Sequence, residues 1–545
     1  MLLSEKQRTS RPVFRYRLAL GILIVVICAA NVLWIRINVA PPRMYDDAVY
    51  LTDSVKLFQT IQERGLAPFL RDCAEATKGH PPMIKILPVP FYFLFGPRTA
   101  SALYAYTLLI AIFCIYLFLL ARDLFHSEEI AIFAVVICTA FPLTYGMWRN
   151  VMAEFGTTVA VTACLYHLVR SDGFRIRKHV LLASLFFGWG MLWKISFPIF
   201  LIGPMMYVVI CRARNRIGNL GLFGATVLLV AGPFYIIGGR EVIRFARFSA
   251  GTSQYNEMWS LGPVLSPKTV MLYWLNIVNF GISPYVFGVL AVLLVIYHRC
   301  FRAGVFRKDV LWLLGAWLAP PLLFFSFQVL KEIRHLLPAL PVIAIAGAVL
   351  LVSILNGVGR LTRHALLAVL CAYPAYQFIA LSFDTPYIHR KDLRLGPFIL
   401  SVKDLELASL QLTPTYTFPA NPVAWPTQEV VSAIVSHTSH LDGHLPDVRV
   451  VGEHPYLSGL VLMYQSVLSG TPITSHGPFS REDPALSDFS VVVCGPEEKY
   501  GPLDVREPRL AALLADPRNG FQEVARVRLP SQCDALIYKN DRLVH

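Results

Sequence analysis

Charged residues are scarce in this sequence, since Asp, Glu, Lys and Arg make up only 15% of its 545 residues. An average soluble protein carries about 25% charged residues, so the scarcity excludes an ordinary soluble domain. Hydrophobic residues reach 55%, and the mean hydropathy is +0.54. The composition therefore predicts a polytopic membrane protein.

Metal-ligand spacings and repeats are also lacking. The ten cysteines are scattered and form no CxxC pair, so their spacing indicates neither a zinc site nor a disulfide framework. No internal repeat or low-complexity tract is present. The net charge of +14 comes from basic residues in short clusters between apolar segments, which the positive-inside rule explains. We therefore expect membrane lipids around this chain and no nucleic acid.

Apolar runs long enough to span a membrane are abundant, because a helix needs about 20 apolar residues to cross the hydrocarbon core. The region 180–211 has basic flanks and only Lys194 inside it, so we expect it to cross twice, with short spans. The run 269–298 is too long for one span and predicts an interfacial helix followed by one crossing. The total is eleven spans, the others being 18–35, 99–121, 130–148, 151–169, 217–239, 310–330, 335–359 and 364–383.

The distribution of basic residues predicts the orientation. Residues 1–17 are basic and are followed by a full-length span with no small-residue cleavage site, as in a signal anchor. The N-terminus is therefore expected in the cytoplasm, and most basic residues outside the tail fall on the same side. We expect a transmembrane domain over 18–383, with a first external loop at 41–97, and an extracytoplasmic region over 384–545.

The tail has a different composition. It begins with the Pro-rich stretch "TPTYTFPANPVAWP", after which short β-branched runs alternate with helical patterns. This alternation predicts a small soluble α/β domain. Cys494 and Cys533 could pair there in an oxidising compartment, but their separation in space does not follow from the sequence.

Two adjacent carboxylates stand out in the first external loop, in "YDDAVY" at 45–50. A single Asp is a common N-cap of a helix, and the following residues have helical apolar spacing. A cap accounts for only one of Asp46 and Asp47. The pair also suits proton abstraction, cation binding or sugar-hydroxyl binding.

Further polar residues lie near predicted outer ends of spans. His80 precedes two prolines and is expected in extended backbone, or exposed at an ordinary helix start. Arg149 and Glu154 flank the start of an apolar run, where ionisable groups usually face a cavity or each other. The alternative is that Arg149 reaches the headgroups and Glu154 complements the helix dipole. Lys194 lies at another outer turn, where it could also reach the headgroups.

A group of basic residues lies on the predicted extracytoplasmic side, where the positive-inside rule predicts few basic residues. Lys331, Arg334 and His335 precede the long apolar helix in "QVLKEIRHLLPALPVIAIAG", residues 328–347. The planar guanidinium of arginine binds phosphate oxygens in a forked geometry. A cationic cluster at headgroup level therefore favours a phosphorylated lipid as ligand.

These segments, taken in order, resemble motifs of the GT-C-fold lipid-phosphosugar transferases, which include protein O-mannosyltransferases and lipid A aminoarabinose transferases. "YDDAVY" resembles their acidic first-loop motif, although Asp-Glu is commoner there than Asp-Asp. "RHLLPALPVIAIAG" resembles their Arg-Tyr-Leu-Leu-Pro segment, with His335 in place of tyrosine. Order and spacing agree over about residues 15–383, the remaining matches being "GHPPMIKILPVPFYFLFG", "WRNVMAEF" and "MLWKISFPIFLIGP".

The resemblance implies a cell-envelope glycosyltransferase that moves a hexose or pentose from a polyprenyl-phosphate donor to an acceptor hydroxyl on the extracytoplasmic face. The acceptor, whether protein, lipid or glycan, is left open, as is the sugar. A divalent metal occurs in some relatives, but these residues do not assure one. The implied roles are catalysis by Asp46 as base with Asp47 orienting sugar or acceptor, binding of donor phosphate by Arg334, Lys194, Lys85, His80 and His335, and binding of sugar or acceptor by Glu154 and Arg149.

A transporter or flippase is the main alternative, with Asp46, Glu154 and Lys194 along a pathway. The predicted charges gather on one face of the membrane and no inverted repeat is present, both of which disfavour it. An oligosaccharyltransferase would share the fold, but its WWD-type motif is absent from the sequence.

Overall fold

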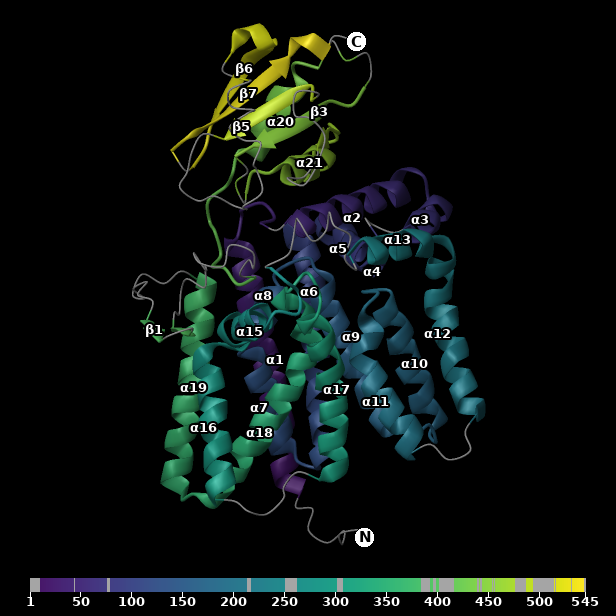
Figure 1. The fold of residues 1–545 in the computed structure, drawn as a ribbon, viewed down its shortest axis with the longest axis vertical. Coiled ribbons are helices and arrows are strands. Elements are labelled where there is room, and N and C mark those ends of the chain that lie inside the picture. Colours follow the sequence, from purple (N-terminus) through teal and green to yellow (C-terminus); the bar gives the residue numbers. More distant parts are fainter. Residues whose placement is uncertain are drawn as a thin grey trace.

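The computed structural model is mostly helical, with a small mixed domain at one end (Figure 1). It describes residues 10–43, 45–75, 79–212, 217–249, 262–300, 307–383, 393–395, 398–400, 416–438, 441, 444–452, 454, 456–475, 487–493, 514, 516–530 and 532–543. Cys494 is outside these ranges, so its pairing with Cys533 stays a prediction.

Each predicted span coincides with helical structure. By length and hydropathy, six of the described helices can cross a membrane, and a bent pair adds a seventh. The protein is therefore an integral, multi-pass membrane protein. The bundle comprises α1 (Ser10–Ile37), α6 (Thr99–Phe125), α7 (Glu128–Thr139), α9 (Ala153–Arg170), α10 (Arg177–Met191), α11 (Phe197–Arg212), α12 (Ile217–Ile237), α16 (Pro284–Cys300), α17 (Lys308–Ser326), α18 (Leu340–Gly357) and α19 (Arg360–Phe383).

Two of the predicted regions, 130–148 and 180–211, form helices shorter than a full span. The region 180–211 gives α10 and α11, of 15 and 16 residues, so each is only about 23 Å long at about 1.5 Å per residue. The run 130–148 divides into α7 and α8 (Pro142–Met147), because Pro142 lacks the N–H that would continue the first helix.

The run 269–298 behaves as predicted. It forms α15 (Pro267–Asn276), a π-helical turn η1 (Ile277–Ile282) and then α16, with a bend of 98° between the two parts. Ser283 lies at this bend with a positive φ of 83°, and Pro284 begins the upright helix. The first part therefore lies across the bundle and the second part runs along it (Figure 1).

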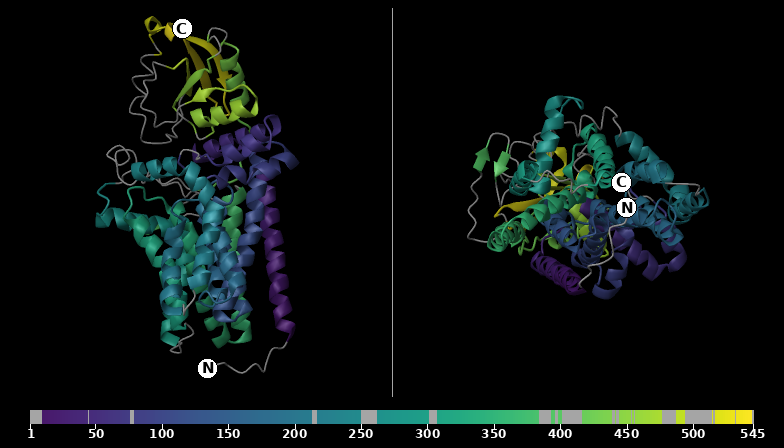
Figure 2. Two further views of the ribbon diagram at one scale, coloured as in Figure 1. Left: turned by 90° about the vertical axis from the view of Figure 1, so that its right-hand side faces the viewer. Right: turned by 90° about the horizontal axis from the view of Figure 1, so that it is seen from below.

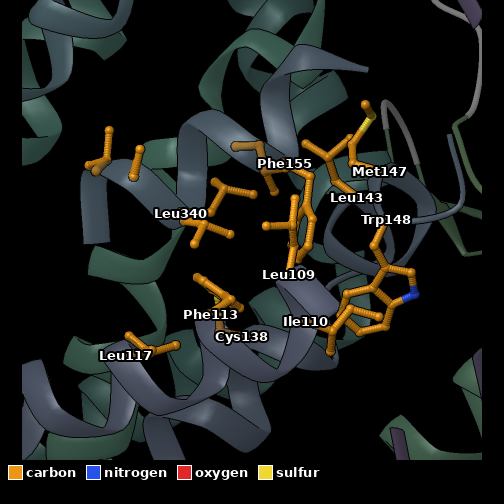
Figure 3. Close-up of a cluster of buried hydrophobic side chains, with 14 of the residues drawn as sticks. Leu109, Ile110, Phe113, Leu117, Cys138, Leu143, Met147, Trp148, Phe155 and Leu340 are labelled. Carbon is orange, nitrogen blue, oxygen red and sulfur yellow. The ribbon is translucent and has the colours of Figure 1, made fainter. Parts of the chain in front are cut away.

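The centre of the bundle is closely packed around α6. Side chains of α6, including Leu109 and Phe113, meet Phe155 of α9, Trp148 and Leu340 at the start of α18 (Figure 3). Trp148 and Phe155 are fully buried. In lipid, helices associate through this kind of dense side-chain packing, which gives the loops at the helix ends a rigid base.

A layer of short helices covers one end of the bundle (Figure 1). It begins with α2 (Tyr45–Glu63), the longest element of the first predicted external loop, and α13 follows the bundle helix α12. The N-terminal end of α1 lies at the opposite end of the molecule from this layer (Figure 2). The layer consists of α2, α3 (Leu66–Cys73), α4 (Met83–Ile86), α5 (Val89–Phe95) and α13 (Gly239–Ser249).

The C-terminal domain is the α/β unit that the sequence predicts. Its five-stranded sheet has the order β4-β3-β5-β7-β6, with parallel pairs at β3 and antiparallel pairs at β7. Two helices, α20 (Thr427–Val435) and α21 (Gly459–Leu468), accompany it. The strands are β3 (Asp447–Val451), β4 (Thr474–Ser475), β5 (Phe489–Val493), β6 (Phe521–Arg528) and β7 (Asp534–Asn540), while β1 (Leu393–Leu395) and β2 (Phe398–Leu400) form a separate hairpin.

Helix α21 joins this domain to the bundle. It packs along α2, and Tyr464 and Val467 belong to the same hydrophobic cluster as the bundle core. Leu462, on the same helix, belongs to the core of the C-terminal domain. Gln59 Nε2 of α2 donates to the Val467 carbonyl at 3.2 Å, and the Tyr464 hydroxyl lies 3.1 Å from Thr99 Oγ1. The domain is thus fixed directly to the helix that carries the two aspartates.

Candidate functional site

The two adjacent aspartates occupy the first turn of α2, where negative charge complements the helix dipole. Successive residues of an α-helix are about 100° apart around the axis, so their side chains face different surroundings. The Asp46 side chain is 44% exposed, whereas Asp47 is only 5% exposed. Burial, followed by the charge of Asp46, raises the pKa of Asp47 well above its usual range. Asp46 is therefore the accessible carboxylate of the pair.

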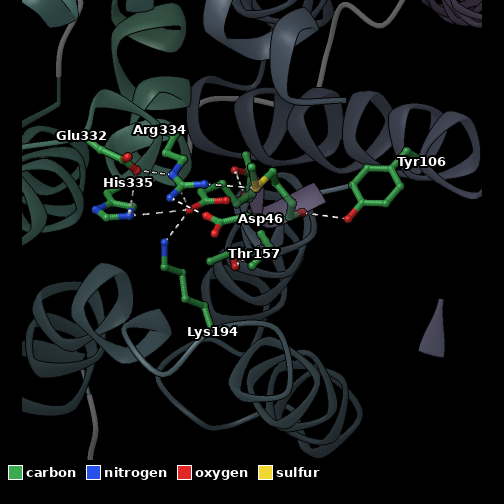
Figure 4. Close-up of polar contacts among 11 residues, drawn as sticks. Asp46, Tyr106, Thr157, Lys194, Glu332, Arg334 and His335 are labelled. Carbon is green, nitrogen blue, oxygen red and sulfur yellow. Dashed lines mark hydrogen bonds and ion pairs between the residues drawn. The ribbon is translucent and has the colours of Figure 1, made fainter. Parts of the chain in front are cut away.

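Arg334 is the centre of a buried charge cluster (Figure 4). Its Nη2 lies 2.9 Å from Asp46 Oδ2, and its Nε lies 3.6 Å from Glu154 Oε1. The guanidinium also pairs with Glu332. Its side chain is 11% exposed, so the cation is withdrawn from water and satisfied by carboxylates from three different segments.

Glu154 connects this arginine to a second cation. Lys194 Nζ donates to Glu154 Oε1 at 2.6 Å, and His335 Nε2 lies 3.7 Å from the same oxygen. Glu154 belongs to the first turn of α9, and Lys194 lies in the turn between α10 and α11. The sequence therefore correctly singled out Asp46, Glu154, Lys194, Arg334 and His335 as residues that meet, although they lie on four segments far apart in the chain.

A short 3-10 helix, η2 (Ile333–Ala339), presents Arg334 and His335. The Pro338 carbonyl accepts a hydrogen bond from Trp317 Nε1 at 3.1 Å, which ties η2 to α17. Lys331, just before it, has a different role. Its Nζ donates to the carbonyls of Ser326 and Gln328 at 2.6 and 2.9 Å, so it satisfies acceptors at the C-terminal end of α17.

His80 lies beside the cluster. Its ring packs edge-on against Tyr50 of α2, with 5.6 Å between centroids, and against Phe245 of α13 at 4.8 Å. Burial lowers its pKa to about 4, and Asp46 and Lys194 are the nearest charges that act on it. The imidazole is therefore neutral at physiological pH and can offer hydrogen bonds to a ligand, not charge.

Lys85 lies away from the cluster. Its Nζ donates to the carbonyls of Asp72, in the last turn of α3, and of Glu75, just after that helix, both at 2.8 Å. The side chain is buried, at 6% exposed. In this arrangement Lys85 fastens the end of α3 to α4 within the first external loop, and the cluster obtains its positive charge from Arg334 and Lys194.

Arg149 is also separate from the cluster, on the other side of the start of α2. Its guanidinium lies over the rings of Trp34 and Phe378, both at 5.1 Å, and its Nη1 donates to Ser382 Oγ at 2.8 Å. Asp47 and Arg149 both line a small cavity of about 20 Å³, enough for about one water molecule. These two residues therefore share a small polar cavity, apart from the charge cluster.

Two residues of the cluster were not predicted. Glu332 is 7% exposed, and burial raises the pKa of its carboxyl. Its signal was present in the sequence, since an acid lies between Lys331 and the basic pair Arg334-His335 in "KEIRH". Tyr416 comes from the C-terminal region, and its ring lies 5.6 Å from the guanidinium carbon of Arg334. No local pattern in the Pro-rich stretch marks this tyrosine.

A divalent metal was left open by the sequence. Within the part of the chain that the structure describes, no group of three or more His, Cys, Asp or Glu side chains could hold a metal ion together. The carboxylates of Asp46 and Glu154 instead face the guanidinium of Arg334. As arranged, these carboxylates are neutralised by cations of the protein.

The arrangement has defined chemical capabilities. Two fixed cations, Arg334 and Lys194, lie side by side and can stabilise a phosphate that gains negative charge. One carboxylate, Asp46, is accessible and can accept a proton from a hydroxyl. Asp46 lies on α2 itself, and the two cations pair with Asp46 or Glu154, at the end of the bundle that α2 covers (Figure 1).

Comparison with known families gives one match. The sequence model of the dolichyl-phosphate-mannose-protein mannosyltransferase family matches residues 79–237. This segment is less than a third of the chain and contains His80, Glu154 and Lys194. No curated protein gives a significant match to the whole sequence.

Comparison with solved structures gives matches over nearly the whole chain. ArnT from Cupriavidus metallidurans bound to undecaprenyl phosphate has a TM-score of 0.56 at 13% identity, over 96% of this chain and 98% of that one. Its apo state gives 0.57 at 14%, over 95% and 98%. The archaeal oligosaccharyltransferase AglB from Archaeoglobus fulgidus, in complex with an inhibitory peptide and a dolichol-phosphate, gives 0.51 at 12%, over 96% and 74%.

These matches confirm the predicted fold class, a polytopic helical domain of GT-C type with a C-terminal soluble domain. Together with the family match, they support the resemblance to lipid-phosphosugar transferases that five short motifs indicated.

Proposed function

We propose that the protein is a membrane glycosyltransferase that moves a sugar from a polyprenyl-phosphate donor to an acceptor hydroxyl on the extracytoplasmic face. The observation that carries the proposal is the position of Arg334 between Asp46 and Glu154, with Lys194 on the other side of Glu154. A phosphate-binding pair of cations thus lies next to an accessible base. The family match and the fold of the two proteins bound to polyprenyl phosphates support the same class of donor.

The orientation follows from the charge distribution. The first turns of α1 carry Arg15 and Arg17 and lie at the end of the molecule opposite the C-terminal domain (Figure 2). The positive-inside rule places the basic end in the cytoplasm. The C-terminal domain and the cluster below it then face the extracytoplasmic side, where a polyprenyl-phosphate sugar can enter from the bilayer with its phosphate at headgroup level.

The reaction is a single displacement. The acceptor oxygen forms a bond to the anomeric carbon while the bond from that carbon to the phosphate oxygen breaks. The proton of the acceptor hydroxyl passes to the Asp46 carboxylate, and the polyprenyl phosphate leaves with the negative charge. Arg334 and Lys194 stabilise that charge in a site from which most water is excluded.

The ion pair between Asp46 and Arg334 links donor binding to the carboxylate. A donor phosphate at the guanidinium takes the place of Asp46 as its partner, which leaves the Asp46 carboxylate free to face the acceptor hydroxyl.

The alternative, a transporter or flippase, lacks a matching arrangement. Transporter sites lie near the bilayer midplane between repeats. The cluster here lies beneath α2, at one end of the bundle (Figure 1). A carboxylate that is 44% exposed beside two buried cations fits catalysis at the membrane surface.

The test uses the full-length protein in sealed proteoliposomes with labelled polyprenyl-phosphate sugars and an extract of envelope acceptors. We expect release of polyprenyl phosphate with transfer of label, and a loss of about 10²-fold or more in Asp46→Asn, the scale of general base catalysis. Glu63→Gln, an exposed carboxylate at the far end of α2, is the matched control and should retain full activity. Label that crosses the bilayer still attached to its lipid would support the transporter instead.

A further inference from the structure

A short segment of the C-terminal region lies inside the bundle. We call residues 416–421 the strap. Tyr416, Phe418 and Ala420 are buried and belong to the hydrophobic cluster of the bundle core. The strap is held by backbone hydrogen bonds on both sides, from the Ala420 N–H to the Ser382 carbonyl and from the Val39 N–H to the Asn421 carbonyl, both at 2.9 Å.

The strap is also fixed at its first residue. Asn150 Nδ2 donates to the carbonyls of Gly146 and Tyr416, at 2.7 and 3.1 Å. A Cβ added at Gly146 would lie 2.8 Å from the Tyr416 carbonyl oxygen, so only glycine allows this approach. Thr417 Oγ1 donates to the Pro142 carbonyl at 2.9 Å. The position of Tyr416 is therefore set by α8 and the turn after it, not by chance packing of a linker.

Tyr416 contributes both a ring and a hydroxyl to the charge cluster. Its ring lies over Arg334, which favours the guanidinium electrostatically. The side chain is 2% exposed, and its hydroxyl has no hydrogen-bond partner within the described residues. Another buried tyrosine near the site, Tyr106, donates to the Met152 carbonyl at 2.8 Å. An unpaired buried hydroxyl is costly, and this one lies beside the guanidinium that binds the donor phosphate in the proposed function, so that phosphate is its natural partner.

We propose that Tyr416 is a donor-binding residue, whose hydroxyl donates to an oxygen of the lipid-linked phosphate that Arg334 binds. The inference rests on the proposed function and extends it, because it assigns a part of the binding site to the C-terminal region. The ring of Tyr416 holds the guanidinium of Arg334 in place, and its hydroxyl adds a second hydrogen-bond donor to the phosphate-binding site. A phosphate has enough acceptor oxygens to bind both groups at once.

The consequence is that the tail is part of the donor site. The strap leads directly into α20 and the rest of the C-terminal domain, which is itself fixed to α2 through α21. The element that carries Asp46 and the element that carries Tyr416 are therefore both held by the C-terminal domain.

The experiment measures the affinity of the purified full-length protein for undecaprenyl phosphate. Tyr416→Phe keeps the ring over Arg334 and removes only the hydroxyl. A hydrogen bond to a charged group contributes enough to binding that we expect the Kd to rise by about 10-fold or more. Tyr416→Leu also removes the ring, so its Kd should rise further. Tyr92→Phe is the matched control, since Tyr92 is equally buried with an unpaired hydroxyl but packs against Phe58, and its Kd should stay unchanged.

The outcomes separate the two proposals. If the wild type binds undecaprenyl phosphate and Tyr416→Phe binds it equally well, the role of the hydroxyl is refuted and the proposed function stands. If the wild type does not bind it, the proposed donor class fails and this inference fails with it. Thermal unfolding of each variant without donor shows whether a change in Kd reflects loss of fold, and Tyr416→Phe should unfold at or above the wild-type temperature, because it removes an unpaired buried hydroxyl.

Discussion

Replacement of Glu154 by leucine should strongly destabilise the bundle, because it leaves a buried cation without its partner. Lys194 Nζ lies 2.6 Å from Glu154 Oε1, and the two side chains are 14% and 5% exposed. The Coulomb attraction at this distance is about 6 kcal/mol for an effective dielectric constant of about 20. Desolvation offsets much of this, and the loss of one partner of a buried pair costs about 3–5 kcal/mol.

Replacement of Lys194, the cation of this pair, should lower the unfolding free energy less than replacement of Glu154. When Lys194 is changed to methionine, Glu154 still faces Arg334 at 3.6 Å and His335 at 3.7 Å. Among the described residues, in contrast, no second carboxylate forms an ion pair with Lys194. We therefore expect about 1–3 kcal/mol for Lys194→Met. The double variant should be destabilised by at least about 1 kcal/mol less than the sum of the single variants, since the residues are in contact.

The assay is unfolding of the detergent-solubilised protein by heat or by SDS, followed by tryptophan fluorescence. The control is Glu241→Gln, which breaks an exposed ion pair with Arg244 on α13 and should change stability by about 0.5 kcal/mol at most. Additive effects of the two single variants, or wild-type stability of Glu154→Leu, would refute the reasoning.

Three further predictions concern residues around the site. Gly146→Ala should lower the unfolding free energy by about 1–3 kcal/mol and weaken donor binding, since the new Cβ would press on the carbonyl of Tyr416; thermal unfolding and the Kd for undecaprenyl phosphate report both. Lys85→Met should lower thermal stability, because two hydrogen bonds to the 72–75 turn are lost, while leaving that Kd unchanged. Burial lowers the pKa of His80 to about 4, so its contribution to stability is complete above pH 6.5 and is lost as the pH falls toward 4; His80→Phe should flatten the profile of unfolding temperature against pH in this window.

The helical part of the fold was predictable because its signal is local. A span is recognised from length and hydropathy alone, and the runs at 99–121 and 217–239 correspond to α6 and α12. The division of 130–148 into two helices follows from one proline, Pro142. The sequence shows that this proline lies inside an apolar run. A proline in a membrane helix can also leave the span intact, so the sequence did not predict that the helix breaks here.

The site was predictable only in part. Charged residues at the ends of apolar runs identified Glu154, Lys194 and Arg334, because an ionisable group in a span is unusual enough to indicate a role. Lys85 carries the same signal, but its partners are backbone carbonyls, which no residue type marks in a sequence. Tyr416 carries no signal, because its importance depends on a long-range contact with Arg334.

The seam between the two domains has a practical consequence for how the chain can be divided. Helix α21 offers Leu462 to the core of the C-terminal domain and Tyr464 and Val467 to the membrane part. A fragment that starts after the last bundle helix would retain α21 but expose its apolar side to water, and such fragments tend to aggregate. Expression of the C-terminal domain alone therefore requires polar replacements on that side of α21. The membrane domain without the C-terminal domain would lack the helix that packs along α2.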